Sequence, residues 1–530
     1  MNSLVGTSSL VRLMLRRERV RLTAWVVLLA VVIAGIAASF ESLYPGAPSR
    51  MQFGASIANN PALLTLTGPA FDLSTIGGLT AWRSGSVSAV LGGLMAVFTL
   101  VRHTRADEEG GRLELISSTV VGRYAALTAA LLVVFGAGLV LALLTGIGLL
   151  VQGLPVSGCF ALGLGNAGVV WTFGAATALI AQLTESSRTA TGAASAAVGA
   201  AFLLRAAGDS AGPTWLSWLS PIGWAQRLQP FTGERWWVLA LPAGAALVLT
   251  GVAYAVLGGR DIGAGLIPIR LGPPAAGPAL RGVFGLAWRL HRGALLGWVL
   301  AFAVLGGCVG AIVQGIADIL KTNPQLERIL AASGRGQGIV DSFLATVMGV
   351  LGLVAAAYAV QAALRMRNEE TSQRVEPLLA LAVSRTRLLV SHLAFSSAGA
   401  VVLLAVAGLV AGFAHGLRIG DVGGQVPRVL AAALAQAPAA LVLAGVTAAL
   451  VGVVPRVAVL AWAVLVGCAL LSELGSVLRL DQWVLDVSPF THVPKLPGVD
   501  FHAEPVWWLL VVAVALSAIG LVGFRRRDAG

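Results

Sequence analysis

Long apolar runs alternate with short polar segments along the chain. The runs are roughly 18 to 25 residues long, the length that an α-helix needs to cross a bilayer core of about 30 Å. The pattern therefore predicts an all-α polytopic membrane protein with twelve transmembrane helices. The predicted spans lie near residues 23–42, 84–102, 124–150, 159–183, 189–207, 236–257, 294–316, 339–364, 388–414, 428–453, 457–475 and 506–524.

Composition agrees with this class of protein. Hydrophobic residues make up 57% of the 530-residue chain and charged residues 11%, whereas soluble globular proteins average about 45–50% and about 25%. The mean hydropathy is +0.86. The length alone would suggest several soluble domains, and the composition excludes that interpretation.

Basic residues concentrate on one side of the predicted topology, which holds both termini and the segments 102–123, 258–292 and 365–387. Lys and Arg exceed Asp and Glu there, whereas they nearly balance on the other side. By the positive-inside rule, the basic side and both termini face the cytoplasm. The net charge of +12 is thus explained by topology and contact with membrane lipid. No nucleic-acid partner is expected, because no basic patch is interleaved with exposed aromatic residues.

Two basic amphipathic segments precede predicted spans. VRLMLRRERVRL (residues 11–22) has five arginines among apolar residues and no cleavage site before the first span. It predicts a helix that lies in the membrane interface rather than a signal peptide. PALRGVFGLAWRLHRG (278–293) predicts a second such helix before the seventh span. The segment LGLGNAG (162–168) is typical of close helix packing, and Pro438 of a kink.

Short polar motifs recur in the same order in the two halves of the chain. Since each half holds six predicted spans, both halves would enter the membrane in the same sense, as two parallel six-helix repeats. The predicted domains are a first half at 1–257, a cytoplasmic linker at 258–280 and a second half at 281–530. The matched motifs are Glu108-Glu109 with Glu369-Glu370 at an offset of 261, Glu114 with Glu376 and Arg123 with Arg385 at 262, and residues 188–221 with 456–489 at 268.

A charged segment between the second and third span appears in each half, as ADEEGGRLELISSTVVGR (106–123) and RNEETSQRVEPLLALAVSR (367–385). Acids come first and an arginine closes the segment, which suits a short surface helix with acids at its N-terminus. One interpretation is an ordinary cytoplasmic loop. Because the segment occurs twice, we favour a site that a partner protein holds. The candidate residues are Asp107, Glu108, Glu109, Arg112, Glu114, Arg123, Glu369, Glu370, Arg374, Glu376 and Arg385.

The order E-E-x-G-R-x-E-L with a terminal Arg resembles the coupling-helix region of ABC-2-type exporter permeases. Segments 188–210 and 215–237 are similar to fused two-half permeases of the polyketide-antibiotic (tetronasin-resistance-type) exporter family. The resemblance implies a type V exporter-like fold in the bacterial inner membrane. It also implies export of hydrophobic or amphipathic compounds, driven by two copies of a cytoplasmic ABC ATPase. Thr371-Ser372-Gln373 replace the glycines of the pattern, so the two segments need not engage a partner identically.

The sequence itself places any nucleotide site on another polypeptide. No G-x-x-x-x-G-K-[ST] motif occurs, and neither Lys321 nor Lys495, the only lysines, follows a glycine-rich turn. ATP and Mg would bind to the partner ATPase, and no cofactor is expected on this chain. No catalytic constellation or metal-ligand spacing is present. The sequence therefore predicts a transport subunit rather than an enzyme.

Two charged residues lie within predicted spans, where charges are costly and often functional. Arg205 and Glu473 occupy the same position of the two predicted repeats and could pair across the half–half interface as a gate or substrate contact. Alternatively, each reaches the outer surface by itself. A proton-coupled multidrug antiporter is the second candidate function, although the only span-associated glutamates, Glu41 and Glu473, lie at outer ends. A membrane scaffold without a transport cycle is the third.

Overall fold

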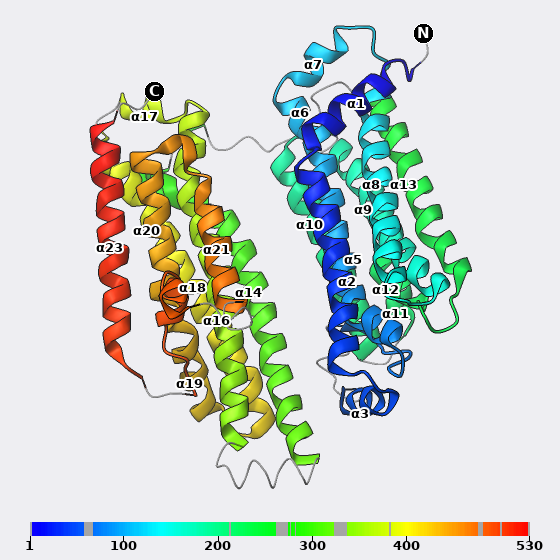
Figure 1. The fold of residues 1–530 in the computed structure, drawn as a ribbon. Coiled ribbons are helices and arrows are strands. Elements are labelled where there is room, and N and C mark those ends of the chain that lie inside the picture. Colours follow the sequence, from blue (N-terminus) through cyan, green and yellow to red (C-terminus); the bar gives the residue numbers. More distant parts are fainter. Residues whose placement is uncertain are drawn as a thin grey trace. The chain divides into compact units, whose positions relative to one another are not determined.

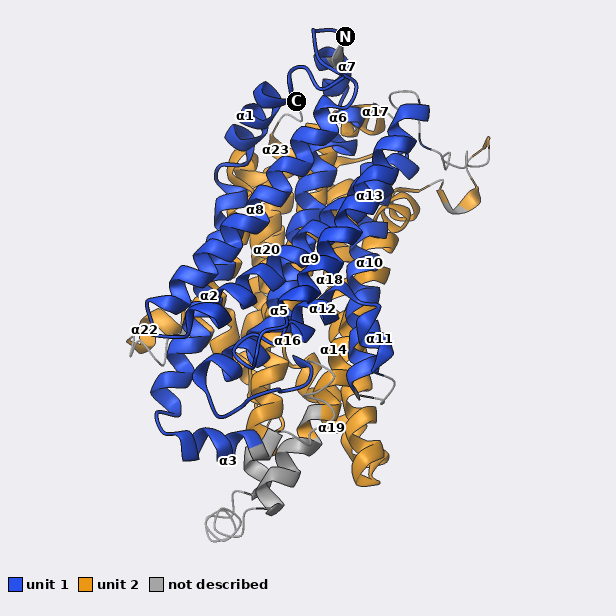
Figure 2. Cartoon of the chain, turned by 90° about the vertical axis from the view of Figure 1, so that its right-hand side faces the viewer, with its two compact units in different colours: residues 1–272 blue, residues 273–530 orange. Residues whose placement is uncertain are grey.

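The computed structural model describes residues 3–57, 67–210, 214–260, 265, 274–275, 277–280, 282–322, 336–380, 383–474, 481–498 and 501–527. Every regular element in these ranges is a helix (Figure 1). The chain divides into two compact units, residues 1–272 and 273–530, which are coloured separately in Figure 2. Each unit has its own buried apolar core.

Unit 1 is built around α9, which packs against α5, α8 and α13. Small residues allow this central position, since a Cβ added to Gly163 of α9 would lie 2.5 Å from the carbonyl oxygen of Ala142 in α8. This confirms that the glycine-rich segment serves close helix packing. The elements are α1 (Thr7–Glu18), α2 (Arg21–Leu43), α3 (Ala47–Ile57), α5 (Ile76–His103), α6 (Arg105–Glu109), α7 (Arg112–Ser117), α8 (Ala125–Leu150), α9 (Val156–Leu183), α10 (Ser187–Ser210), α11 (Trp215–Trp218), α12 (Pro221–Arg227), η1 (Trp236–Leu239) and α13 (Ala240–Gly259).

Unit 2 is centred on α18 and α20. Helix α18 packs against α14, α16 and α19, and α20 packs against α16 and α23. The chain breaks between α19 and α20, and Pro438 lies in the first turn of α20, where the missing N–H costs no helical bond. The elements are η2 (Pro278–Leu280), α14 (Val283–Thr322), α16 (Gly336–Thr371), α17 (Val375–Leu379), α18 (Arg385–Ile419), α19 (Val422–Leu434), α20 (Ala437–Val453), η3 (Pro455–Val457), α21 (Leu460–Leu474), α22 (Gln482–Leu485), η4 (Pro489–His492) and α23 (Ala503–Arg526).

Among the described residues, eleven helical segments are long and apolar enough to cross a membrane. The predicted class, a multi-pass membrane protein, is confirmed. The eleventh predicted span, 457–475, coincides with the shorter apolar helix α21. Its 15 residues extend about 22 Å, less than the hydrocarbon core of a typical bilayer.

The predicted second interfacial helix does not form as a separate element. In unit 1, α1 ends at Glu18 and α2 begins at Arg21. In unit 2, α14 runs unbroken from Val283 to Thr322. His291 of α14 is buried, and its Nε2 lies 2.9 Å from Nδ1 of His392 in α18. This contact holds the polar start of α14 along α18.

Candidate functional site

The charged segment of unit 1 forms two short helices rather than the single one predicted. Helix α5 ends at His103, α6 follows, and Gly110-Gly111 separates α6 from α7. Gly111 has a φ of +67°, a left-handed conformation that glycine adopts without steric cost. The two helices lie at the end of unit 1 that also carries α1 (Figure 1). Asp107 and Glu108 occupy the first turn of α6, as predicted.

Asp107 joins α6 to α1. Its carboxylate accepts hydrogen bonds from Nη1 and Nη2 of Arg17 at 2.8 and 3.1 Å, and Nε of Arg112 lies 3.0 Å from Oδ1. Such a bidentate arginine–carboxylate pair is strong and directional. The hydrogen bond to Asp107 raises the pKa of the Arg17 guanidinium above its ordinary range, although burial acts in the opposite direction. Movement of α6 would therefore carry α1 with it.

Glu108 joins α6 to α13, the last long helix of unit 1. It pairs with Arg105 in its own helix and with Arg260, whose Nη2 lies 2.6 Å from Oε1 of Glu108. Nε of Arg260 also donates to Oε1 of Gln182 in α9 at 2.8 Å. Arg123 completes the connection, because its Nη2 donates to the carbonyl oxygens of Leu257 and Arg260 at the C-terminal end of α13. A cation is favourable at this end of a helix.

Glu109 contacts the start of α10, and α7 presents the exposed surface. The backbone N–H of Ser187, the first residue of α10, donates to Oε1 of Glu109 at 2.9 Å, and the Ser187 hydroxyl donates to Oε2. An acid is favourable at a helix N-terminus. On α7, Glu114 is exposed and the side chains of Arg112 and Leu115 are 57% and 72% exposed.

In unit 2 the acids do not begin a helix, contrary to the prediction. Glu369 and Glu370 lie in the last turn of α16, which ends at Thr371. Their charge is unfavourable at a helix C-terminus, and arginines surround them. Arg365 and Arg374 each lie 3.5 Å from Glu369, Arg367 lies 3.1 Å from Glu370, and Arg527 pairs with Glu370 as well.

The C-terminal end of α23 is held in the same way as that of α13. Arg527 follows α23, and its carbonyl oxygen accepts a hydrogen bond from Nη1 of Arg385. Arg527 itself reaches Glu370. Glu376 lies exposed on α17. Each unit thus has an acid that holds the arginine after its last long helix.

The contacts of the two charged segments correspond at a constant offset of 262 residues. The pair Asp107–Arg112 corresponds to Glu369–Arg374, and Arg105–Glu108 corresponds to Arg367–Glu370. This contact offset is one residue larger than the offset of 261 predicted from the glutamate pairs. Gly111 then corresponds to Gln373, which also has a positive φ, of +56°.

Arg205 has a partner within its own helix. Its side chain is fully buried, and Nη1 lies 3.6 Å from Oδ2 of Asp209, one turn further along α10. Asp209 also accepts a hydrogen bond from Ser217 and pairs with Arg227. Glu473 belongs to α21, and its side chain lies outside the described residues. The pairing of Arg205 with Glu473 stays a prediction.

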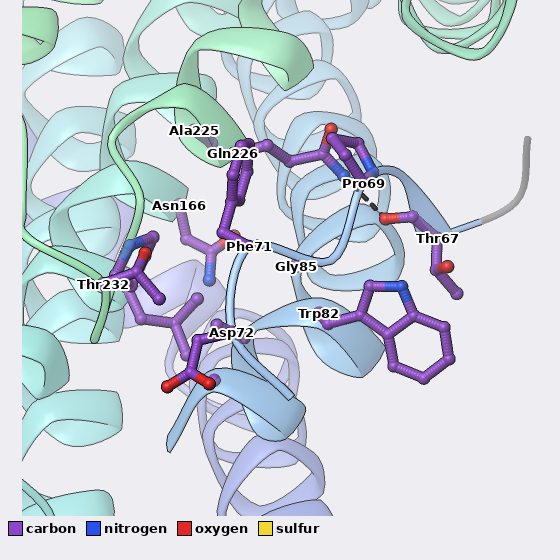
Figure 3. Close-up of a pocket in the computed structure, with 14 residues that line it drawn as sticks. Thr67, Pro69, Phe71, Asp72, Trp82, Gly85, Asn166, Ala225, Gln226 and Thr232 are labelled. Carbon is purple, nitrogen blue, oxygen red and sulfur yellow. Dashed lines mark hydrogen bonds between the residues drawn. The ribbon is translucent and has the colours of Figure 1, made fainter. Parts of the chain in front are cut away.

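A pocket lies at the opposite end of unit 1, between the segment that precedes α5 and helices α5, α9 and α12 (Figure 3). Nε2 of Gln226 donates to the carbonyl oxygen of Thr67 at 2.7 Å and to Ser86 Oγ at 2.8 Å. Nε1 of Trp82 donates to the Gly68 carbonyl oxygen at 3.1 Å. These bonds fix the segment over the pocket.

Asn166 and Asp72 are among the polar side chains that line this pocket. Asn166 is 2% exposed, and its Oδ1 accepts a hydrogen bond from Ser88 at 3.1 Å. Its Nδ2 has no hydrogen-bond partner among the described residues. Burial acts to raise the pKa of Asp72, but hydrogen bonds from Ser74 and Thr75 lower it below its ordinary value. The pocket can offer a donor to a polar group, and no sequence motif had pointed to it.

The chain is similar to known proteins over nearly its full length. The family described as "Multidrug efflux system permease Rv1217c, C-terminal domain" matches residues 280–525. The multidrug efflux system permease protein Rv1217c of Mycobacterium tuberculosis (strain ATCC 25618 / H37Rv) is 45% identical over 524 residues, which are 99% of this chain and 95% of the relative. The chain belongs to this family of multidrug efflux permeases. Together with the apolar helices, this confirms a permease embedded in the membrane.

Sequence reasoning missed several charged residues of this permease. Asp209 could have been found, because it lies four residues after Arg205 and so on the same helix face. The partners of Arg17, Arg260 and Arg527 could not be found, since these arginines meet their acids only after helices distant in sequence have packed together. The sequence shows only that each of these arginines lies at the end of an apolar helix or of α1, which does not indicate its partner.

Proposed function

We propose that the chain is the transmembrane subunit of an ATP-driven ABC exporter that moves hydrophobic or amphipathic compounds, such as polyketide antibiotics and other drugs, out of a bacterial cell. The name of the mycobacterial relative supports drug efflux. The observation that carries the ATP-driven part is the acid–arginine contact set that occurs once in each unit. In unit 1 it ties the short helix α6 to α1 and to the end of α13, and in unit 2 it ties the end of α16 to the residue that follows α23.

The candidate residues divide into two groups by exposure. The acids Asp107, Glu108 and Glu370 are largely covered and bind arginines of other elements. A movement of α6 and α7 would thus be passed to α1, α10 and α13, and a movement of the end of α16 would be passed to α23. The exposed residues would contact the ATPase surface, and they are Arg112, Glu114, Arg374 and Glu376.

The proposed topology has twelve spans in two parallel six-helix repeats, with halves at 1–257 and 281–530 joined by a linker at 258–280. The contacts that correspond at an offset of 262 support it. Helix α21 would supply the twelfth span. Both termini, α6–α7 and α17 would face the cytoplasm of the bacterial inner membrane. One ATPase copy would dock at each short helix, and ATP and Mg would bind to the ATPase.

Charge reversal on the exposed helices tests this function. The permease carrying Glu114→Arg and Glu376→Arg is reconstituted with the candidate ATPase encoded beside its gene. We expect ATP-powered drug efflux to fall at least about tenfold, since like charges would replace complementary ones at both docking sites. The matched control is Glu41→Arg, which changes an exposed glutamate at the opposite end of unit 1.

Two results would contradict the proposal. The first is ATP-powered efflux and ATPase binding that stay unchanged in the double variant. The second is efflux by the unmodified permease that needs a pH gradient and no ATP, which would favour the proton-coupled antiporter.

A further inference from the structure

An apolar groove lies between the first two helices of unit 1 and α8. Its walls include Leu15 of α1, Leu22 of α2, and Val133 and Val140 of α8. Its volume is about 500 Å³, within the usual range of ligand-binding cavities. Leu132 and Val140 are 52% and 48% exposed, so this groove is open at the side of the helix bundle. In a membrane, lipid would meet that opening.

The groove is built by fixed contacts. Leu10 and Met14, on another face of α1, are buried in the core that includes residues of α8. Glu18, at the end of α1, is 1% exposed and lies 3.1 Å from Nε of Arg102 and 3.6 Å from Nε of Arg21. The angle between α1 and α2 is held by these pairs, so the groove does not depend on a ligand to form.

A row of arginines borders the groove. Arg12, Arg16 and Arg19 are spaced at i, i+4 and i+7, which places them on one face of α1. All three are exposed, and Arg19 lines the groove. In the described part of the chain, none of them is paired with an acid, whereas Arg17 and Arg21 are. The row is available to an anion outside the protein.

We propose that the groove binds one acyl chain of a membrane phospholipid with an anionic headgroup, and that the phosphate lies against Arg19 with Arg16 and Arg12 beside it. The guanidinium group matches a phosphate in charge and geometry. A basic amphipathic helix such as α1 lies at the level of the headgroups. The apolar walls of the groove suit the acyl chain of a phospholipid, and the arginines at its rim suit the phosphate. This proposal does not depend on the ATPase partner.

The test measures lipid bound to the full-length permease by native mass spectrometry. The probes are phosphatidylglycerol and phosphatidylcholine with identical acyl chains. Arg19→Gln removes the rim charge, and Gly136→Leu fills the groove. A Cβ at Gly136 meets no atom within 4 Å, so this variant should fold. The matched controls are Gly35→Leu, where a Cβ also meets nothing within 4 Å, and Arg83→Gln, an exposed arginine of α5.

We expect the permease to prefer phosphatidylglycerol, and Arg19→Gln to lower its occupancy about fivefold. Phosphatidylcholine should lose less, because its choline cation offsets the charge of the phosphate. Gly136→Leu should reduce binding of both lipids, because it removes the space for the chain. Both controls should match the unmodified permease. Equal binding of the two lipids, or unchanged phosphatidylglycerol binding in Gly136→Leu, would overturn the proposal. Competition with a drug-like amphiphile gives a further check. If the amphiphile displaced the lipid and bound equally well to Arg19→Gln and to the unmodified permease, the groove would be a drug site and the proposal would be wrong.

Discussion

At the residue scale, the corresponding turns of the two charged segments differ in one informative way. Gly111 and Gln373 both have left-handed backbones, with φ of +67° and +56°. Only glycine adopts this conformation without a steric cost, which is about 1–2 kcal/mol for other residues. Unit 2 has the turn despite this cost. The turn brings Arg374, which follows it, back to Glu369, which precedes it.

Replacement of Gln373 by Gly should therefore stabilise the permease. We expect an increase of about 0.5–1 kcal/mol in the free energy of unfolding, since the relieved strain exceeds the added freedom of the unfolded chain. Thermal unfolding of the purified protein in a mild detergent measures the effect. The reciprocal variant Gly111→Ala should be destabilised. Identical melting of Gln373→Gly and the unmodified protein would mean that the turn carries no strain.

Charge partners close in sequence could be read from the sequence, and distant partners could not. Arg205–Asp209 and Arg105–Glu108 follow the spacing of one helical turn. Arg17–Asp107 and Glu108–Arg260 are separated by 90 and 152 positions, so they depend on which helices become neighbours. The acids of the site were predicted because the charged segment occurs twice, and most of the arginines that hold them were not predicted.

At the element scale, the lengths of the apolar runs predicted the long helices well. They did not predict where each helix begins and ends. Helix α1, which was predicted to lie in the membrane interface, formed as a separate element, but its expected counterpart became the start of α14. The sequence patterns of the two segments are alike. Their tertiary contacts differ: α14 carries the buried pair His291–His392 and α1 carries the pair Arg17–Asp107, and no periodicity reveals either contact.

Close packing of α8 on α9 yields a prediction about one glycine. Gly163→Ala should destabilise unit 1 by about 1–3 kcal/mol, because the new methyl group would overlap the backbone of α8 and force the helices apart. The control is Gly199→Ala in α10, where a Cβ meets nothing within 4 Å. That variant should melt at the same temperature or slightly higher. Equal stability of Gly163→Ala and Gly199→Ala would show that the contact is not needed.

At the scale of the whole molecule, the membrane class, the approximate helix positions and the general assignment to efflux permeases were accessible from the sequence. The pocket beside Asn166 and the groove beside Arg19 were not, because each combines residues of elements far apart in the chain. The proposed correspondence of the two halves was suggested by the motifs. Its register became clear only from the salt bridges.

Two corresponding short helices imply two docking sites, which can be counted. On the proposed function, the unmodified permease should bind two ATPase copies. Glu114→Arg and Glu376→Arg should each leave one, and the double variant should leave none, because each reversal acts only at its own helix. Native mass spectrometry of the purified complexes gives the ratio, and Glu41→Arg should retain two. If either single variant lost both copies, the helices would form one composite site; if neither lost any, the docking surface would lie elsewhere.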